Sequence, residues 1–124
     1  MSRNILFVAL GGMLGSVGRF LSVSGIVYLL PYRFPLGTFI VNIIGSFLMG
    51  SAVGFAERNL WFHQEWRIFL TAGFCGGFTT FSAFAFENVE LLLDKNYATV
   101  AIYSIASVVL CIVAALAGLI LTRS

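Results

Sequence analysis

The chain has 124 residues, of which 60% are hydrophobic and 10% are charged, and its formal net charge is +2. Soluble domains carry roughly 25% charged residues, so this composition argues against a soluble protein. Four apolar stretches reach the ~20 residues that cross a bilayer, at about 5–30, 36–56, 68–93 and 97–121. We therefore predict an all-α membrane protein, with one transmembrane domain of four helices over residues 1–124.

The first stretch holds Gly11 and Gly15 in a G-x-x-x-G pair, a spacing that lets another helix approach closely. Its apolar run continues past Arg19 and no A-x-A pattern closes it, so we expect a mature helix rather than a signal peptide. Arg19 is the only cation well inside an apolar stretch, where charge is expensive. Its charge could attract anions into a vestibule, or its side chain could snorkel toward the headgroups.

The second stretch carries a full amide, Asn42, among apolar residues. Polar side chains inside a membrane usually face the bundle interior and find partners there. Two roles are open: Asn42 donates a hydrogen bond to a passing ion, or it holds two helices together. For an isolated asparagine the second role is the commoner one.

The third stretch contains the most informative segment, residues 73–87, with the sequence GFCGGFTTFSAFAFE. Glycine inside a helix costs about 1 kcal/mol relative to alanine, and two adjacent glycines before two β-branched threonines predict a broken helix. Lipid cannot satisfy the backbone groups that a break exposes, so a break is stable only within protein or beside a water-filled cavity. Breaks of this kind commonly build ion sites.

Phenylalanines follow one another through this segment. Phe78, Phe81 and Phe84 have three-residue spacing, which predicts a shared helix face. An aromatic ring has a positive edge, so ring edges along a narrow path can contact a small anion. Phenylalanine is otherwise a packing or lipid-facing residue. Hydroxyls interleaved with the rings, such as that of Ser82, can donate to an anion and favour the ion path.

Three more polar residues extend this pattern. Glu87 follows Phe84 by one turn and fits either a pore mouth or an interface position. Tyr103 and Ser107 lie one turn apart in the fourth stretch, where they could continue a polar path or simply bond between helices. The sole histidine, His63, has no nucleophile partner, and no P-loop or H-E-x-x-H motif is present, so we expect no enzyme.

Charge specifies the orientation only weakly. Four spans place both termini and the middle loop on one side, which then holds Arg3, Arg58, Arg67 and Arg123. The other side holds Arg33 and Lys95, and Arg19 is ambiguous. Because topology follows the lysine and arginine excess in short loops, this difference is a small bias. Either one orientation wins by a modest margin, or the chain inserts both ways and two copies pair as an inverted dimer.

Over essentially its whole length, the sequence resembles the Fluc/CrcB family of small dual-topology fluoride channels. The resemblance rests on the residues at 15–19, the GTFIVNIIGSFLMG stretch around Asn42, the GFCGGFTTFSAF run at 73–84, Glu87, and Tyr103 with Ser107. It implies an antiparallel homodimer in a bacterial inner membrane. Such a dimer has two pores and lets fluoride leave the cell passively.

The resemblance also assigns roles to residues. Phe81 and Phe84 match pore-lining phenylalanines whose ring edges face the anion, and Asn42 matches the pore asparagine. Arg19 matches an arginine near the vestibule. A polar track that leads out of the phenylalanine region is matched by Ser82, Tyr103, Ser107 and Glu87. Ala83 departs from the threonine of the family pattern and removes one hydroxyl from this track.

A cofactor and partners are implied as well. The backbone carbonyls of Gly76 and Thr79, from both subunits, match the site of a central structural sodium ion (Na+). The expected partners are a second copy of the chain, the fluoride ion and the lipid bilayer, and no nucleic acid is expected.

Two other classes are open at this point. A small four-helix proton-coupled drug exporter also pairs inverted copies, but it needs a membrane-embedded carboxylate in its first helix, where this chain has Arg19 and no acid. A non-transporting assembly subunit held by G-x-x-x-G contacts would tolerate loss of Asn42 and Phe81 together, whereas a channel would lose ion flux.

Overall fold

The computed structural model describes residues 2–30 and 34–123, which form helices joined by short connections. In chain order the helices are α1 (Ser2–Leu29), α2 (Leu36–Arg58), α3 (Gln64–Ile68), η1 (Phe69–Cys75), α4 (Gly76–Phe78), α5 (Phe81–Leu93) and α6 (Tyr97–Arg123). No strand occurs in the described ranges, so the predicted all-α class is confirmed. Arg33, which enters the charge comparison, lies outside the described residues.

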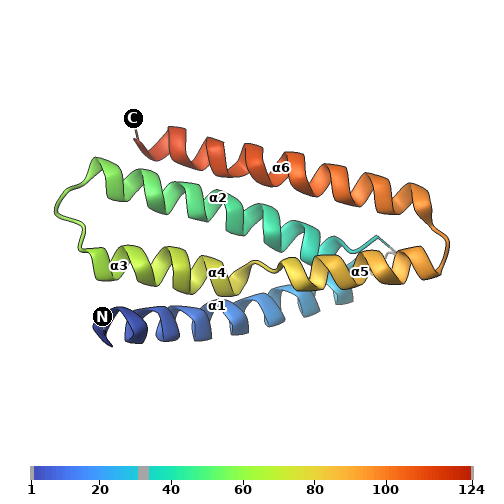
Figure 1. Cartoon of the computed structure of the whole chain (residues 1–124), viewed down its shortest axis with the longest axis horizontal. Coiled ribbons are helices and arrows are strands. Elements are labelled where there is room, and N and C mark those ends of the chain that lie inside the picture. Colours follow the sequence, from blue (N-terminus) through green and yellow to red (C-terminus); the bar gives the residue numbers. More distant parts are fainter. Residues whose placement is uncertain (1, 31–33, 124) are drawn as a thin grey trace.

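The helices form four antiparallel spans, each long and apolar enough to cross a membrane. They are Ser2–Leu29, Leu36–Arg58, Gln64–Leu93 and Tyr97–Arg123. Both termini and the connection from α2 to α3 lie at one end of the bundle, and the connection from α5 to α6 lies at the other (Figure 1). The predicted number and order of spans are confirmed.

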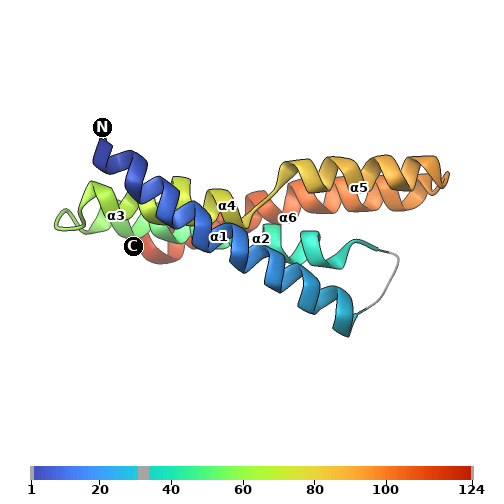
Figure 2. The ribbon, with the colours of Figure 1, turned by 90° about the horizontal axis from the view of Figure 1, so that it is seen from below.

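The third span changes its packing partner halfway. Its first half, α3 with η1 and α4, packs against α1, whereas its second half, α5, packs against α6. Figure 2 shows α1 crossing the bundle beneath α4 while α5 runs beside α6. A straight helix could not serve both partners, because α1 and α6 lie in different directions from it. The change of partner therefore depends on a change of direction within the span.

Two irregular segments in the third span produce this change. Phe69–Cys75 forms a π-helix, η1, which the sequence did not predict. After α4, the backbone becomes extended at Thr79 (φ −89°, ψ 159°) and Thr80 (φ −152°, ψ 121°), and helix resumes at Phe81. The predicted break is confirmed, and its extended residues are the two threonines.

The glycines that predicted the break have another role. Gly76 and Gly77 are helical, and a methyl group at Gly77 would lie 2.7 Å from the carbonyl oxygen of Gly12 in α1. The prediction that Phe78 shares a face with Phe81 and Phe84 is wrong, because the break falls between them. Phe78 is buried and stacks on another phenylalanine of its own half-span, with ring centroids 5.6 Å apart.

The predicted close approach at the G-x-x-x-G pair is confirmed, and the helix that approaches is the first half of the third span. A methyl group at Gly11 would overlap the Phe69 carbonyl oxygen, and one at Gly15 would overlap the Phe74 carbonyl oxygen. Small residues thus let α1 contact the backbone of η1 and α4 directly, as expected where no hydrophobic driving force acts between helices.

We predict that Gly15→Ala destabilises the fold while Gly25→Ala, in the same helix, does not. Nothing lies within 4 Å of a methyl group at Gly25, whereas a methyl group at Gly15 would lie 2.9 Å from the backbone nitrogen of Phe78. Overpacking at Gly15 should lower the free energy of unfolding by about 1–3 kcal/mol. Thermal unfolding in detergent, followed by circular dichroism, measures the difference, and equal melting temperatures would contradict it.

Candidate functional site

An asparagine from α2 holds the break in place. The Asn42 amide nitrogen donates to the Thr80 carbonyl oxygen at 3.1 Å, and the Thr80 N–H donates to the Asn42 side-chain oxygen at 2.8 Å. Both backbone groups of one extended residue are therefore satisfied by one side chain. Of the two roles open for Asn42, the contact between helices is what the structure shows. Its amide has a second N–H, which can still face a ligand.

An arginine from α1 holds the other side of the break. The Arg19 Nε donates to the Gly77 carbonyl oxygen at 3.1 Å. In a continuous helix this carbonyl would accept from the backbone N–H of Phe81, four residues on. Arg19 supplies the missing donor, so its Nε is engaged with the protein backbone at the break.

Several carbonyls of the break lose their helical donors, and those of Gly76 and Thr79 are among them. The Thr80 N–H, which a continuous helix would direct to the Gly76 carbonyl, donates to Asn42 instead. The Ala83 N–H, which would reach the Thr79 carbonyl, donates to the Thr80 hydroxyl oxygen at 3.1 Å. Within residues 2–30 and 34–123, no other donor replaces them. Carbonyls freed in this way suit a hard monovalent cation, as in other unwound membrane helices.

A cation bound at the break would depend on these backbone oxygens rather than on side chains. Among the residues that the structure describes, no group of three or more His, Cys, Asp or Glu side chains could hold a metal ion. Gly76 is exposed on the surface of the single chain. The freed carbonyls therefore match the donor chemistry of the sodium site that the resemblance implied, at Gly76 and Thr79.

A carboxylate connects three spans beside the break. The Thr38 hydroxyl of α2 and the Tyr103 hydroxyl of α6 each donate to the Glu87 carboxylate of α5 at 2.8 Å. Thr38 and Tyr103 are buried. Thr38 was missed in the sequence, although it lies one helical turn before Asn42 and so on the same face of α2. Its spacing from Asn42 was the signal that could have found it.

Aromatic rings link the break to this carboxylate. The Phe81 and Phe84 ring centroids lie 5.5 Å apart, and the Phe84 and Tyr103 centroids lie 4.9 Å apart. The rings are tilted against each other, at 41° and 52°. Phe81 is 78% exposed in the single chain. Phe81, Phe84 and Tyr103 thus form one continuous series of rings.

A groove of about 430 Å³ runs along this series, between α2, the break, α5 and α6. Its walls include Asn42, Thr79, Phe81, Phe84 and Ser107. Ser107 is buried, and its hydroxyl has no hydrogen-bond partner among the described residues. An unpaired buried hydroxyl costs about 1–3 kcal/mol, so this oxygen is suited to a ligand or water in the groove.

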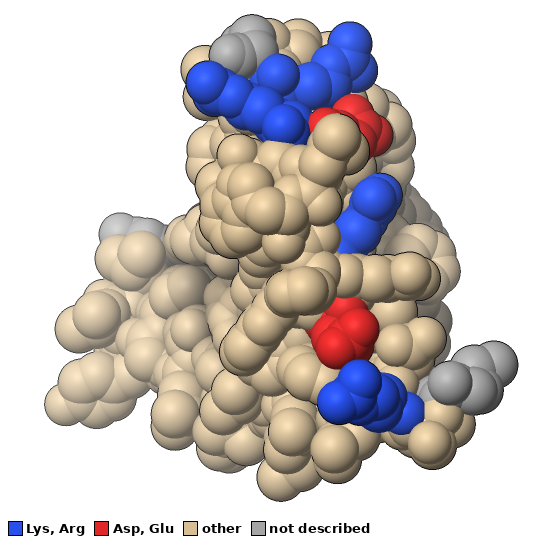
Figure 3. Space-filling model, turned by 90° about the vertical axis from the view of Figure 1, so that its left-hand side faces the viewer, with Lys and Arg blue, Asp and Glu red and all other residues tan. Residues whose placement is uncertain are grey.

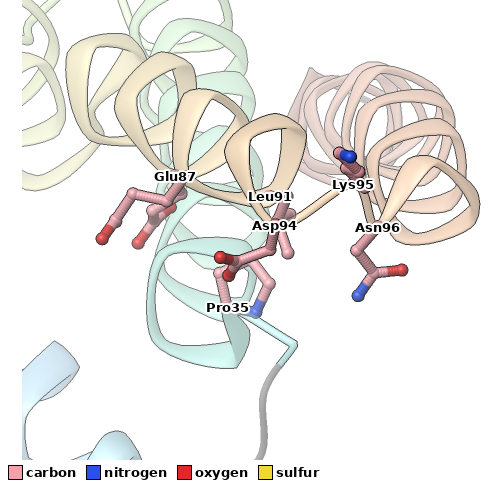
Figure 4. Close-up of a pocket in the computed structure, with 7 residues that line it drawn as sticks. Pro35, Glu87, Leu91, Asp94, Lys95 and Asn96 are labelled. Carbon is pink, nitrogen blue, oxygen red and sulfur yellow. The ribbon is translucent and has the colours of Figure 1, made fainter.

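The other predicted residues lie outside the groove. Ser82 is exposed, and its hydroxyl lies 3.3 Å from that of Thr80. Glu87 lines a second, polar recess of about 740 Å³, together with Glu90, Asp94 and residues of the α5–α6 connection. In Figure 4, Asp94 extends from the end of α5 toward Pro35 at the start of α2. The recess is thus rich in carboxylates, and among the described residues that line it Lys95 is the one cation.

Basic side chains concentrate at the opposite end of the molecule. The end with both termini carries several lysine or arginine side chains and fewer acidic ones (Figure 3). The helix bounds place Arg3, Arg58, Arg67 and Arg123 in the parts of the spans that meet there. Within the described residues, Lys95 lies at the other end, between α5 and α6. The sequence predicted that this end is richer in arginine, and the described residues confirm that prediction.

The fold and the site define a small multi-pass membrane protein whose third helix is interrupted next to a polar and aromatic groove. A family model described as "CrcB-like protein, Camphor Resistance (CrcB)" matches residues 6–119. The chain belongs to this CrcB-like family, which confirms the resemblance seen in its sequence.

Similar proteins cover nearly the whole chain. The "Fluoride-specific ion channel FluC" of Azobacteroides pseudotrichonymphae genomovar. CFP2 is 43% identical over 123 residues, which are 99% of this chain and 98% of the relative. The protein of the same name from Geobacter sulfurreducens is 43% identical over 96% of each chain. That from Bacteroides fragilis is 45% identical over 94% of this chain and 93% of the relative.

We predict that Asn42→Ala loosens the break, whereas Asn59→Ala does not. Truncating Asn42 leaves the Thr80 N–H and carbonyl unpaired, at a cost of about 1–3 kcal/mol for each buried group. Asn59 also donates to a backbone carbonyl, that of Phe55, but within an exposed helix end. Hydrogen exchange of residues 76–83, followed by mass spectrometry, should accelerate in the first variant alone. Unchanged protection in Asn42→Ala would contradict the role given to this amide.

Proposed function

We propose that this chain is a fluoride-specific ion channel of the bacterial cell membrane, and that it conducts the anion passively. The observation that carries the proposal is the groove, where the Asn42 amide, the Phe81 and Phe84 rings and the unpartnered Ser107 hydroxyl meet beside a helix break. Family membership and the names of the similar proteins support it. No catalytic chemistry is required of these residues.

The donors of the groove suit a small, strongly hydrated anion. Fluoride must exchange its water for other donors, and the groove offers a hydroxyl and the free N–H of an amide that is already anchored. Phenylalanine ring edges add a weak positive potential without binding the ion tightly. Conduction requires binding that is weak enough for exit, so this mixture fits transport better than storage. Chloride is larger, and we expect it to fit poorly once the groove is closed into a narrow path.

We also propose that two copies pair in opposite orientations, with one pore on each side of the dimer. In the single chain the groove is open, and both Phe81 and Gly76 are exposed. A second copy against this face would cover the freed carbonyls, which lipid cannot satisfy. The modest difference in arginine content between the two ends is consistent with insertion in both directions.

A structural sodium ion between the two copies completes the proposal. The Gly76 and Thr79 carbonyls would hold it, and an inverted partner would contribute the same two groups. When bound, the ion would supply positive potential between the two pores. The support for this site is the diversion of the Thr80 and Ala83 N–H groups to side chains, which leaves both carbonyls without donors.

Fluoride efflux from liposomes tests the function. We expect efflux well above that of empty vesicles, with little chloride efflux, when potassium flow through valinomycin balances the charge. Phe81→Ile should lower the efflux rate about tenfold, equivalent to ~1.4 kcal/mol, because the ring edge is lost. Phe86→Ile, in the same helix but outside the groove walls, is the matched control. No efflux above empty vesicles, or equal chloride efflux, would refute the proposal.

Removal of sodium tests the cation site. Replacing sodium with N-methyl-D-glucamine at constant ionic strength should lower the melting temperature and the efflux rate, because an ion that binds only the folded dimer stabilises it by mass action. At a sodium concentration of 100 times the Kd this stabilisation is about 2.7 kcal/mol. If neither the melting temperature nor the efflux rate depends on sodium, the result counts against an ion at Gly76 and Thr79.

A further inference from the structure

Tyr103 contacts a wall residue of the groove and a wall residue of the acidic recess. Tyr103 is completely buried, at 0% exposure. Its ring contacts that of Phe84, a groove wall residue, and its hydroxyl donates to Glu87, a recess wall residue. Phe84 and Glu87 lie one turn apart on α5. The orientation of Tyr103 therefore affects both cavities at once.

Two phenylalanines pack on Tyr103 from the side of α2. The Phe34 ring meets the Tyr103 ring edge-on, with centroids 5.3 Å apart and planes at 78°. Phe39 approaches it at 6.2 Å and is itself perpendicular to Phe34, at 5.5 Å and 89°. Phe34 and Phe39 are among the wall residues of neither cavity. Their ring contacts are with Tyr103 and with each other.

The position of Phe34 is fixed by its backbone and by its ring contacts, so it can orient the Tyr103 ring. It lies directly before α2, where Pro35 caps the helix, and its carbonyl oxygen accepts from the Leu36 N–H at 2.7 Å. Its ring is half-buried in the aromatic cluster. Edge-to-face contacts of this type favour a particular mutual orientation of two rings beyond the area they bury. Phe34 thus constrains the ring plane of Tyr103 in a way that an aliphatic side chain does not.

We propose that Phe34 is a positioning residue for ion conduction, acting through Tyr103 on Phe84. The inference rests on the proposed channel function. With Phe34 present, the Tyr103 ring is fixed between Phe34 and Phe84, and its hydroxyl stays on Glu87. Phe84 is then held with one orientation at the groove wall. Without the Phe34 ring, Tyr103 and Phe84 gain rotational freedom, and the ring edge offered to the anion is no longer preorganised.

The test compares substitutions that separate the ring from its apolar volume. Phe34→Leu, which keeps an apolar side chain but no ring, should lower fluoride efflux about three- to tenfold, the range expected for loss of one aromatic pair. Phe34→Tyr, which keeps the ring, should restore efflux to the wild-type rate. Phe55→Leu is the control, because Phe55 makes similar edge-on contacts, at 5.2 and 5.8 Å, with Phe62 and Trp61 at the other end of the molecule.

A double variant shows whether the effect of Phe34 on efflux depends on Tyr103. In Tyr103→Leu, the further change Phe34→Leu should not lower efflux again, because the two residues act as one unit. All variants are first matched for elution volume and melting temperature. Wild-type efflux in Phe34→Leu, or an equal second loss in the Tyr103→Leu background, would overturn this inference but not the proposed function. Absence of efflux from the wild-type protein would overturn the proposed function, and this inference with it.

Discussion

The two hydrogen bonds between Asn42 and the backbone of Thr80 are the constraint on which the site depends. An extended residue inside an apolar span exposes an N–H and a carbonyl, and in hydrocarbon each unsatisfied group costs several kcal/mol. Asn42 satisfies both, and Arg19 satisfies the carbonyl of Gly77 nearby. With these partners, three backbone groups of the break are satisfied, which offsets part of its cost relative to a continuous helix. Without them, regular hydrogen bonding would favour a straight third span.

Everything around the groove follows from that break. It turns the third span away from α1 and toward α6, which brings Phe84 against Tyr103 and Glu87 within reach of two hydroxyls. It also frees backbone oxygens that a continuous helix would occupy. Neither a drug exporter nor an inert assembly subunit requires this arrangement, and α1 offers Arg19 where an exporter would need an acid.

Much of this architecture could be predicted from the sequence, because apolar length and glycine–threonine chemistry are local signals. The four spans, the break and the close approach at Gly15 are of this kind. The engagement of Arg19 with a backbone carbonyl, the Thr38 hydroxyl and the π-helix before the break depend on how the spans pack. The false expectation for Phe78 had the same origin: three-residue spacing assumes a continuous helix, and the extended threonines interrupt it.

The order of these elements along the chain has a consequence for biogenesis. Both side chains that stabilise the break, Arg19 and Asn42, precede it in the sequence. Protein synthesis proceeds from the N-terminus, and earlier segments can begin folding while later ones are made. When residues 76–83 leave the ribosome and enter the bilayer, Arg19 and Asn42 have already been synthesised. The Gly77 carbonyl and both peptide groups of Thr80 can therefore be satisfied as soon as the third span enters the bilayer.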